Sequence, residues 1–185
     1  MKKILLIAFL CFLTACEKDD QPEDDPGNFQ TPLPAATTTG ANIFACYVDG
    51  KAYIAYAKDI VAYNQVFEGR YGISIDGKWS ESDYISTISL MSDTAEEIQE
   101  GMTYELGKVP PAFSGIDYYA GYVFFRNYNQ FGTGRTTDEI HKGELRITQH
   151  DIFERILSGT FWFDLKRPDG KVIEIREGRF DVRYN

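Results

Sequence analysis

Short runs of alternating hydrophobic and polar residues occupy most of the chain from residue 41 to the C-terminus. A repeat of two places successive side chains on opposite faces of a β-strand, so each run predicts one strand. Only residues 94–101 have a pattern that could form one or two helical turns, ended by Gly101. Besides the hairpins described next, we expect strands at residues 71–76, 84–91, 102–106, 118–126 and 144–148.

The total of about nine or ten antiparallel strands with short turns predicts an all-β fold. We favour an antiparallel β-sandwich with at most one short helical turn. The alternative is a lipocalin-like β-barrel, because closure of a single sheet would also bury one face of each strand.

Asp49-Gly50 is the clearest turn signal, because a two-residue type I′ hairpin needs positive φ at both positions. This turn pairs Cys46 with Tyr53. Both faces of the hairpin are largely apolar, which indicates strands covered on both sides. We therefore interpret Cys46 as a small core residue rather than a nucleophile.

The C-terminal region predicts two further turns. Pro168-Asp169-Gly170 is a loop of odd length that joins the strand ending at Leu165 to the strand containing Ile173 and Ile175. A two-residue turn at Glu177-Gly178 would start another strand, with Phe180 opposite Ile175 and Val182 opposite Ile173. Both turns are compatible with the expected inward-facing residues.

The N-terminus has the order of a secretory signal peptide. Lys2 and Lys3 precede an apolar run over residues 4–12, and small residues precede Cys16. The apolar run is shorter than the ~20 residues needed to cross a bilayer. We therefore expect residues 1–15 to be a signal peptide that is removed.

The sequence L-T-A-C, which ends at Cys16, resembles the lipobox of bacterial lipoproteins. This resemblance implies that Cys16 carries acyl chains such as palmitate and that the membrane is a partner of the mature protein. Lys18-Asp19-Asp20 resembles the export signal of surface lipoproteins of Bacteroidota. It implies a location on the cell surface of the outer membrane; the alternative is its periplasmic face.

Residues 16–40 are rich in Asp, Glu, Pro and Thr and contain little to bury, so we expect an acidic flexible linker after Cys16. Residues 41–185 then form a single β domain. Whether part of the Thr-Pro segment docks on this domain is left open. With Cys11 removed and Cys16 lipidated, only Cys46 remains, so no intramolecular disulfide is expected.

Charge and histidine content limit the chemistry that the domain can perform. The formal net charge of −9 and the lack of a basic stripe argue against nucleic acid as a partner. The two histidines, His141 and His150, come with no nucleophile elbow and no zinc or calcium ligand spacing. We therefore expect no enzyme activity, no catalytic residue, no cofactor and no metal site.

Residues 118–131 are unusually aromatic. Tyr118, Tyr122 and Tyr128 share one face of a strand, and a platform of exposed rings could stack on sugars or hold a peptide. Trp162 adds to this set, because strand parity places it outward and opposite Arg176. The alternatives are burial of the tyrosines on both faces and a cation–π pair between Trp162 and Arg176.

Segments at both ends of the domain resemble a recurrent domain of uncharacterised Bacteroidota lipoproteins, among them T-T-T-G-A-N-I-F-A-C-Y-V-D-G-K (37–51), I-L-S-G-T-F (156–161) and G-R-F-D-V (178–182). The resemblance implies a compartment and a fold type but no catalytic residues. We expect a lipid-anchored, non-catalytic binding module for a glycan or for an envelope or host protein. A structural or assembly lipoprotein is the alternative, and a hydrolase is less favoured.

Overall fold

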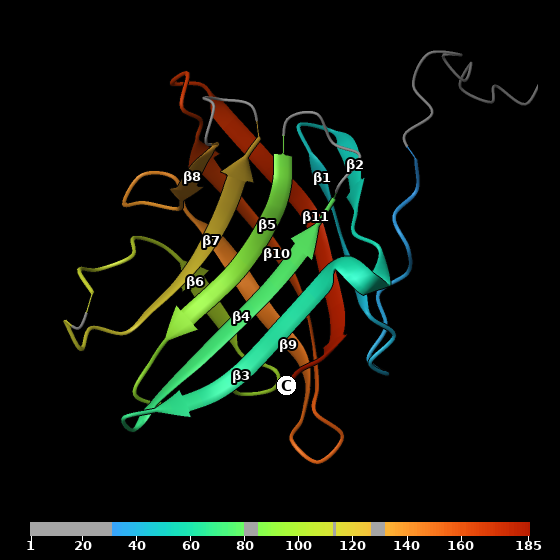
Figure 1. The fold of residues 1–185 in the computed structure, drawn as a ribbon, viewed down its shortest axis with the longest axis vertical. Coiled ribbons are helices and arrows are strands. Elements are labelled where there is room, and N and C mark those ends of the chain that lie inside the picture. The colour runs from blue at the N-terminus through green and yellow to red at the C-terminus, as the bar shows by residue number, and fades with distance from the viewer. Residues whose placement is uncertain (1–30, 80–84, 113, 127–131) are drawn as a thin grey trace, which may run out of the picture.

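Two antiparallel sheets pack face to face in the computed structural model (Figure 1), which describes residues 31–79, 85–112, 114–126 and 132–185. The six-stranded sheet has the order β2-β1-β11-β10-β9-β6, and the five-stranded sheet has the order β3-β4-β5-β7-β8. The strands are β1 (Ile43–Val48), β2 (Lys51–Ile54), β3 (Ile60–Phe67), β4 (Arg70–Lys78), β5 (Ile85–Asp93), β6 (Thr103–Leu106), β7 (Tyr118–Phe125), β8 (Thr133–Thr136), β9 (Gly143–Asp151), β10 (Ile156–Lys166) and β11 (Val172–Arg183).

The fold is a β-sandwich, as the alternation pattern predicted. The two sheets do not close on one another, so the barrel alternative is wrong. Residues 94–101 do not form the helical turns that their pattern allowed. Thr94 instead pairs with Tyr71 through two backbone hydrogen bonds, and Gly101 N–H donates to Ile147 O.

The 3₁₀ turn η1 (Ala57–Asp59) is the only helix among the residues that the structure describes. Within that part of the chain, no helix is both long and apolar enough to cross a membrane.

The core lies between the sheets and is built around aromatic rings. Phe161 packs against Phe44 at 5.2 Å and against Phe180 at 6.4 Å between ring centroids. The ring of Phe163 reaches the opposite sheet, where a Cβ added to Gly121 would lie 2.8 Å from it. A glycine there lets the bulky ring fill the space between the sheets without overpacking.

The Asp49-Gly50 turn is confirmed, since both residues have positive φ (47° and 77°) and Cys46 pairs with Tyr53. Cys46 is fully buried in the core, and this burial raises the pKa of its thiol. Its interpretation as a core residue is therefore confirmed.

The C-terminal turns have different outcomes. The loop at residues 168–170 is confirmed, because Phe163 pairs with Ile175 and Gly170 has a φ of 87°. The turn at Glu177-Gly178 is wrong: β11 continues through it and pairs with β10 as far as Arg183. Glu177, with a φ of 50°, is instead part of a β-bulge.

The bulge and the predicted turn have the same effect on which residues face the core. One extra residue in a strand moves the inward-facing positions from odd to even residue numbers, as a two-residue hairpin turn here would also do. Phe180 and Val182 therefore face the core as expected, but they pair with Gly159 and Leu157 of β10 rather than with Ile175 and Ile173.

Two strands were missed in the sequence. β3 carries exposed apolar residues near its end, including Val66 and Phe67, so its pattern does not alternate cleanly. β8 is four residues long, contains Gly134 and is held by its pairing with β7. The formation of such a strand depends more on pairing with its neighbour than on the β-propensity of its own residues.

The segment before β1 docks on the domain, which the sequence left open. Figure 1 shows residues 31–41 running alongside β1 and β2. Tyr47 donates a hydrogen bond from its hydroxyl to Thr31 O (3.3 Å), and Arg179 donates one to Pro34 O (3.2 Å).

Candidate binding groove

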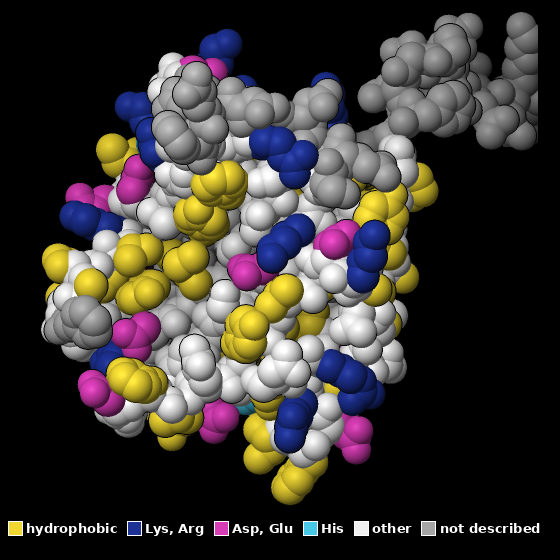
Figure 2. All heavy atoms as spheres, in the orientation of Figure 1, with side chains coloured by type: hydrophobic (Ala, Val, Ile, Leu, Met, Phe, Trp, Pro, Cys, Tyr) yellow, Lys and Arg dark blue, Asp and Glu magenta, His cyan; other side chains and the backbone are white. Residues whose placement is uncertain are grey.

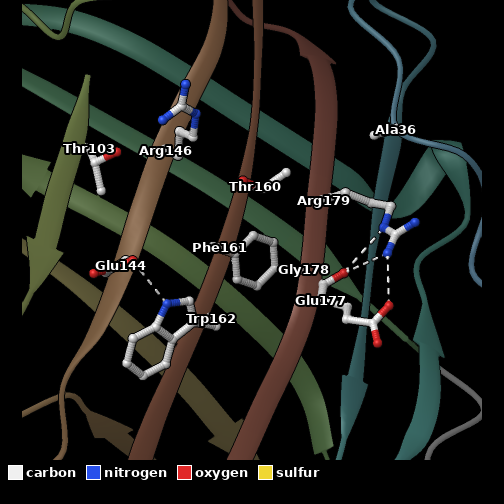
Figure 3. Close-up of a pocket in the computed structure, with 10 residues that line it drawn as sticks. All are labelled: Ala36, Thr103, Glu144, Arg146, Thr160, Phe161, Trp162, Glu177, Gly178 and Arg179. Carbon is white, nitrogen blue, oxygen red and sulfur yellow. Dashed lines mark hydrogen bonds and ion pairs between the residues drawn. The ribbon is translucent and has the colours of Figure 1, made fainter. Parts of the chain in front are cut away.

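The outer face of the six-stranded sheet carries a groove of about 490 Å³, which we call the outer groove (Figure 3). Its residues come from β6, β9, β10, β11 and the docked N-terminal segment. They are Ala36, Thr103, Glu144, Arg146, Thr160, Phe161, Trp162, Glu177, Gly178 and Arg179. The volume lies within the range of about 300–1,000 Å³ that is typical of small-ligand sites.

The alternation of side chains along β10 contributes to this hollow. Thr160 and Trp162 point outward, while Phe161 points into the core. Gly178 lies across from Phe161 and faces the core with it, since a Cβ there would lie 2.5 Å from the Phe161 ring. On the outer face, Thr160 adds only a small side chain between Arg146 and Arg179.

Trp162 is the largest side chain in the groove, and it is held on two sides. Its side chain remains 38% exposed. The indole Nε1 donates a hydrogen bond to Glu144 Oε2 (3.2 Å), and the guanidinium carbon of Arg176 lies 5.5 Å from the ring centroid. The outward position of Trp162 is confirmed, and the ring forms the cation–π pair with Arg176 that was the alternative to a binding role.

Two arginines flank Thr160 in the register of the sheet, with Arg146 on β9 and Arg179 on β11. Arg179 is already engaged, because it donates hydrogen bonds to the carbonyl oxygens of Glu177 and Pro34. Within the described part of the chain, the guanidinium of Arg146 has no hydrogen bond and no ion pair. The groove therefore contains one arginine with free donors.

The N-terminal segment forms one wall of the groove through Ala36, and the carboxylate of Asp181 holds that segment in place. Asp181 is fully buried. It accepts hydrogen bonds from Thr37 Oγ1 (2.6 Å), Ser158 Oγ (2.7 Å) and the backbone N–H groups of Thr39, Gly40 and Ala41.

The electrostatics of Asp181 follow from these contacts. Burial by itself raises the pKa of the carboxyl, but the hydrogen bonds from Ala41, Thr37, Ser158 and Gly40 outweigh it and lower the pKa to about 2. The sequence offered no sign of this role, because Asp181 lies in a strand and its partners in the N-terminal segment are about 140 residues away.

The predicted tyrosines lie on the other side of the sandwich. Tyr118 and Tyr122 stand half-buried on the outer face of β7 in the five-stranded sheet, and the Tyr122 ring lies against Gly134 of β8. Tyr128 lies outside the described residues. Figure 2 shows this face with apolar side chains in separate patches among polar ones. The structure therefore does not bring Trp162 together with Tyr118 and Tyr122.

The polar groups around the histidines have other partners. His150 Nδ1 lies 3.1 Å from Ile98 O, and the Asp151 carboxylate accepts backbone hydrogen bonds from the following turn. His141 lies 3.0 Å from Asp138 within one short turn. Among the residues described, no group of three or more His, Cys, Asp or Glu side chains could hold a metal ion.

The lipidation site Cys16 and the signal Lys18-Asp19-Asp20 lie outside the described residues. Comparison with protein-family models, with curated proteins and with solved structures found no match to this chain. The resemblance to Bacteroidota lipoproteins therefore stays a prediction.

Proposed function

We propose that this protein is a lipid-anchored, non-catalytic glycan-binding module of the outer membrane surface, and that it binds its ligand in the outer groove. The observation that carries the proposal is Trp162, a partly exposed ring that Glu144 and Arg176 hold in place beside a hollow. A ring that is fixed before binding loses little conformational entropy when a ligand stacks on it.

The polar groups of the groove suit a sugar. The C–H face of a pyranose can pack on an indole, while its hydroxyls need donors and acceptors around the ring. Thr160, Arg146 and the carboxylate of Glu144 supply such groups within the same groove. The two groove carboxylates already accept hydrogen bonds, Glu144 from Trp162 and Glu177 from Arg179, which supports binding rather than catalysis.

The anchor is part of the proposal. A lipid on Cys16 would join the membrane to a segment that is docked from Thr31 onward. The chain advances 15 residues from Cys16 to Thr31, so it can span at most about 50 Å. This reach would let the groove stand clear of the membrane surface.

The test compares two aromatic substitutions on opposite faces. We expect Trp162→Ala to abolish glycan binding, measured by array screening and then by calorimetry, and Tyr122→Ala to leave it unchanged. Both variants should keep a cooperative thermal transition. Unchanged binding by a folded Trp162→Ala protein would overturn the proposed site.

A protein partner is the second candidate, because two hairpin ends expose large apolar side chains. Phe67 at the end of β3 is 70% exposed, and Phe153 between β9 and β10 is 91% exposed. Exposed apolar groups of this kind mark interaction surfaces. A photo-crosslinking amino acid at position 153, compared with one at the polar position 169, would trap an envelope partner on cells if this candidate is right.

A further inference from the structure

The chemistry of the outer groove narrows the class of glycan, an inference that rests on the proposed function. We propose that the ligand is an acidic saccharide, one with a carboxylate on a pyranose ring, and that Arg146 binds this carboxylate. Hexuronates and sialic acids both present this group.

The first observation is the unpaired guanidinium. Most of the charged groups around the groove are satisfied: Glu144 accepts from Trp162, Arg176 pairs with Asp164 (2.6 Å), and Arg179 donates to backbone carbonyls. The guanidinium of Arg146 differs from these, because it has neither a hydrogen bond nor an ion pair to any residue that the structure describes.

The second observation is the register. Arg146 lies directly across from Thr160, and Arg179 lies on the other side of the same threonine. Directly opposed residues on one face have Cβ atoms about 4.5–5.5 Å apart. A group bound above Thr160 would therefore lie beside one guanidinium with free donors and near a second guanidinium, that of Arg179, which is paired with Glu177.

The third observation is the position of Trp162. It follows Thr160 by two residues on β10, so both side chains point to the same face about 7 Å apart. A pyranose ring packed on the indole would place a ring substituent over Thr160. A carboxylate there matches the planar fork of an arginine, which binds it through two parallel hydrogen bonds.

The negative net charge of the protein restricts the binding of an acidic ligand to sites with local positive charge. At −9 the chain as a whole repels polyanions, so an acidic ligand needs a local positive site to bind. The guanidinium of Arg146, with that of Arg179 nearby, supplies that site at the groove. Binding of an acidic ligand there would weaken with added salt, because the site lies at the surface.

The experiment uses matched acidic and neutral probes. Calorimetry would measure the binding of trigalacturonate against its carboxyl-reduced counterpart, and of sialyllactose against lactose. A sulfated lactose would distinguish a carboxylate from another anion. The proteins are the wild type, Arg146→Gln, Arg146→Lys, Trp162→Ala and Arg135→Gln. Arg135 is an exposed arginine on β8 of the other sheet and serves as the matched control.

We expect the wild type to bind at least one acidic probe about tenfold more tightly than its neutral counterpart. Arg146→Gln should remove that preference and keep the weaker neutral binding, and Arg146→Lys should restore part of it. Trp162→Ala should lose both, and Arg135→Gln should lose neither.

The contrary outcomes separate the two proposals. Equal binding of acidic and neutral probes, a preference for the sulfated probe, or a preference that survives in Arg146→Gln would overturn the acidic-ligand inference while glycan binding through Trp162 stands. Failure of every probe to bind the wild type would overturn this inference. Trp162-independent binding would overturn the proposed site itself.

Discussion

On the five-stranded sheet, Tyr118 and Tyr122 stand among polar side chains that pair with each other, whereas on the six-stranded sheet Trp162 borders a groove with an unpaired arginine. Arg70, at the end of β4, donates to Asp93 (2.6 Å) and to Asp117 (2.9 Å). Arg146 on the opposite face has no such partner among the described residues. Aromatic content alone therefore does not identify a site; a hollow with unsatisfied polar groups is more informative.

The two faces also differ in how they are bordered. Residues 31–41 cover part of the six-stranded sheet and form a wall of its groove, and the buried carboxylate of Asp181 holds residues 37–41 of this segment. No equivalent segment among the described residues crosses the face that carries Tyr122 (Figure 1). Changes to Asp181 should therefore affect one face and leave the other intact.

The largest effect is expected from Asp181→Ala. This change leaves several buried donors without an acceptor, so we expect the free energy of unfolding to fall by about 3 kcal/mol. Residues 31–41 should become open to proteolysis, and ligand binding in the groove should weaken. Chemical denaturation and limited proteolysis would measure both.

Asp76→Ala on the five-stranded face is the control for that change. Among the residues that the structure describes, the Asp76 carboxylate accepts one long hydrogen bond, from Ser74 (3.4 Å), so its loss should change stability by less than about 0.5 kcal/mol. Retention of a protected N-terminal segment in Asp181→Ala would contradict the role of this carboxylate.

A smaller effect is expected from pH. The folded-state pKa of Asp181 is about 2, below the ordinary 3.8, so its contribution to stability is complete above about pH 5 and is lost as the pH falls from about 4 toward 2. Denaturation of the wild type and of Asp181→Asn across this range would show their stability difference shrinking with acid. A difference that stays constant would mean that the carboxylate does not titrate as described.

The smallest effect should come from the two arginines. Arg70→Gln should lower the melting temperature slightly, because two ion pairs at the surface are lost, whereas Arg146→Gln should leave it unchanged. Differential scanning calorimetry at low and high salt would compare them. A drop for Arg146→Gln as large as that for Arg70→Gln would indicate that Arg146 has a structural partner after all.

Much of the fold could be predicted because turns and inward positions depend on neighbouring residues. Asp49-Gly50 forms a type I′ turn because both residues adopt positive φ. The alternation in β10 placed Phe161 and Phe163 inward and Trp162 outward. The bulge at Glu177 was mistaken for a turn, because both preserve the same inward-facing residues.

The candidate site could be predicted only in part. The outward position of Trp162 was predicted from the alternation of side chains along its strand. The expectation that it lies with Tyr118 and Tyr122 was not correct, because this alternation does not show which sheet a strand joins. Arg146, Thr160 and Asp181 were missed. Their roles arise from pairing between β9, β10 and β11 and from contacts with residues 37–41, which no local pattern shows.

By itself the sequence determined the strand character, the hairpin at Asp49-Gly50 and the burial of Cys46, since these depend on the period of two and on local backbone conformation. Tertiary structure alone decided that β11 runs on between β1 and β10, that Asp181 fastens the segment before β1, and that Trp162 and Tyr122 face opposite ways. The pairing of β11 with β1 and the contacts of Asp181 join residues more than 100 positions apart, and the free energy of these contacts comes from burial and hydrogen bonding across the whole domain.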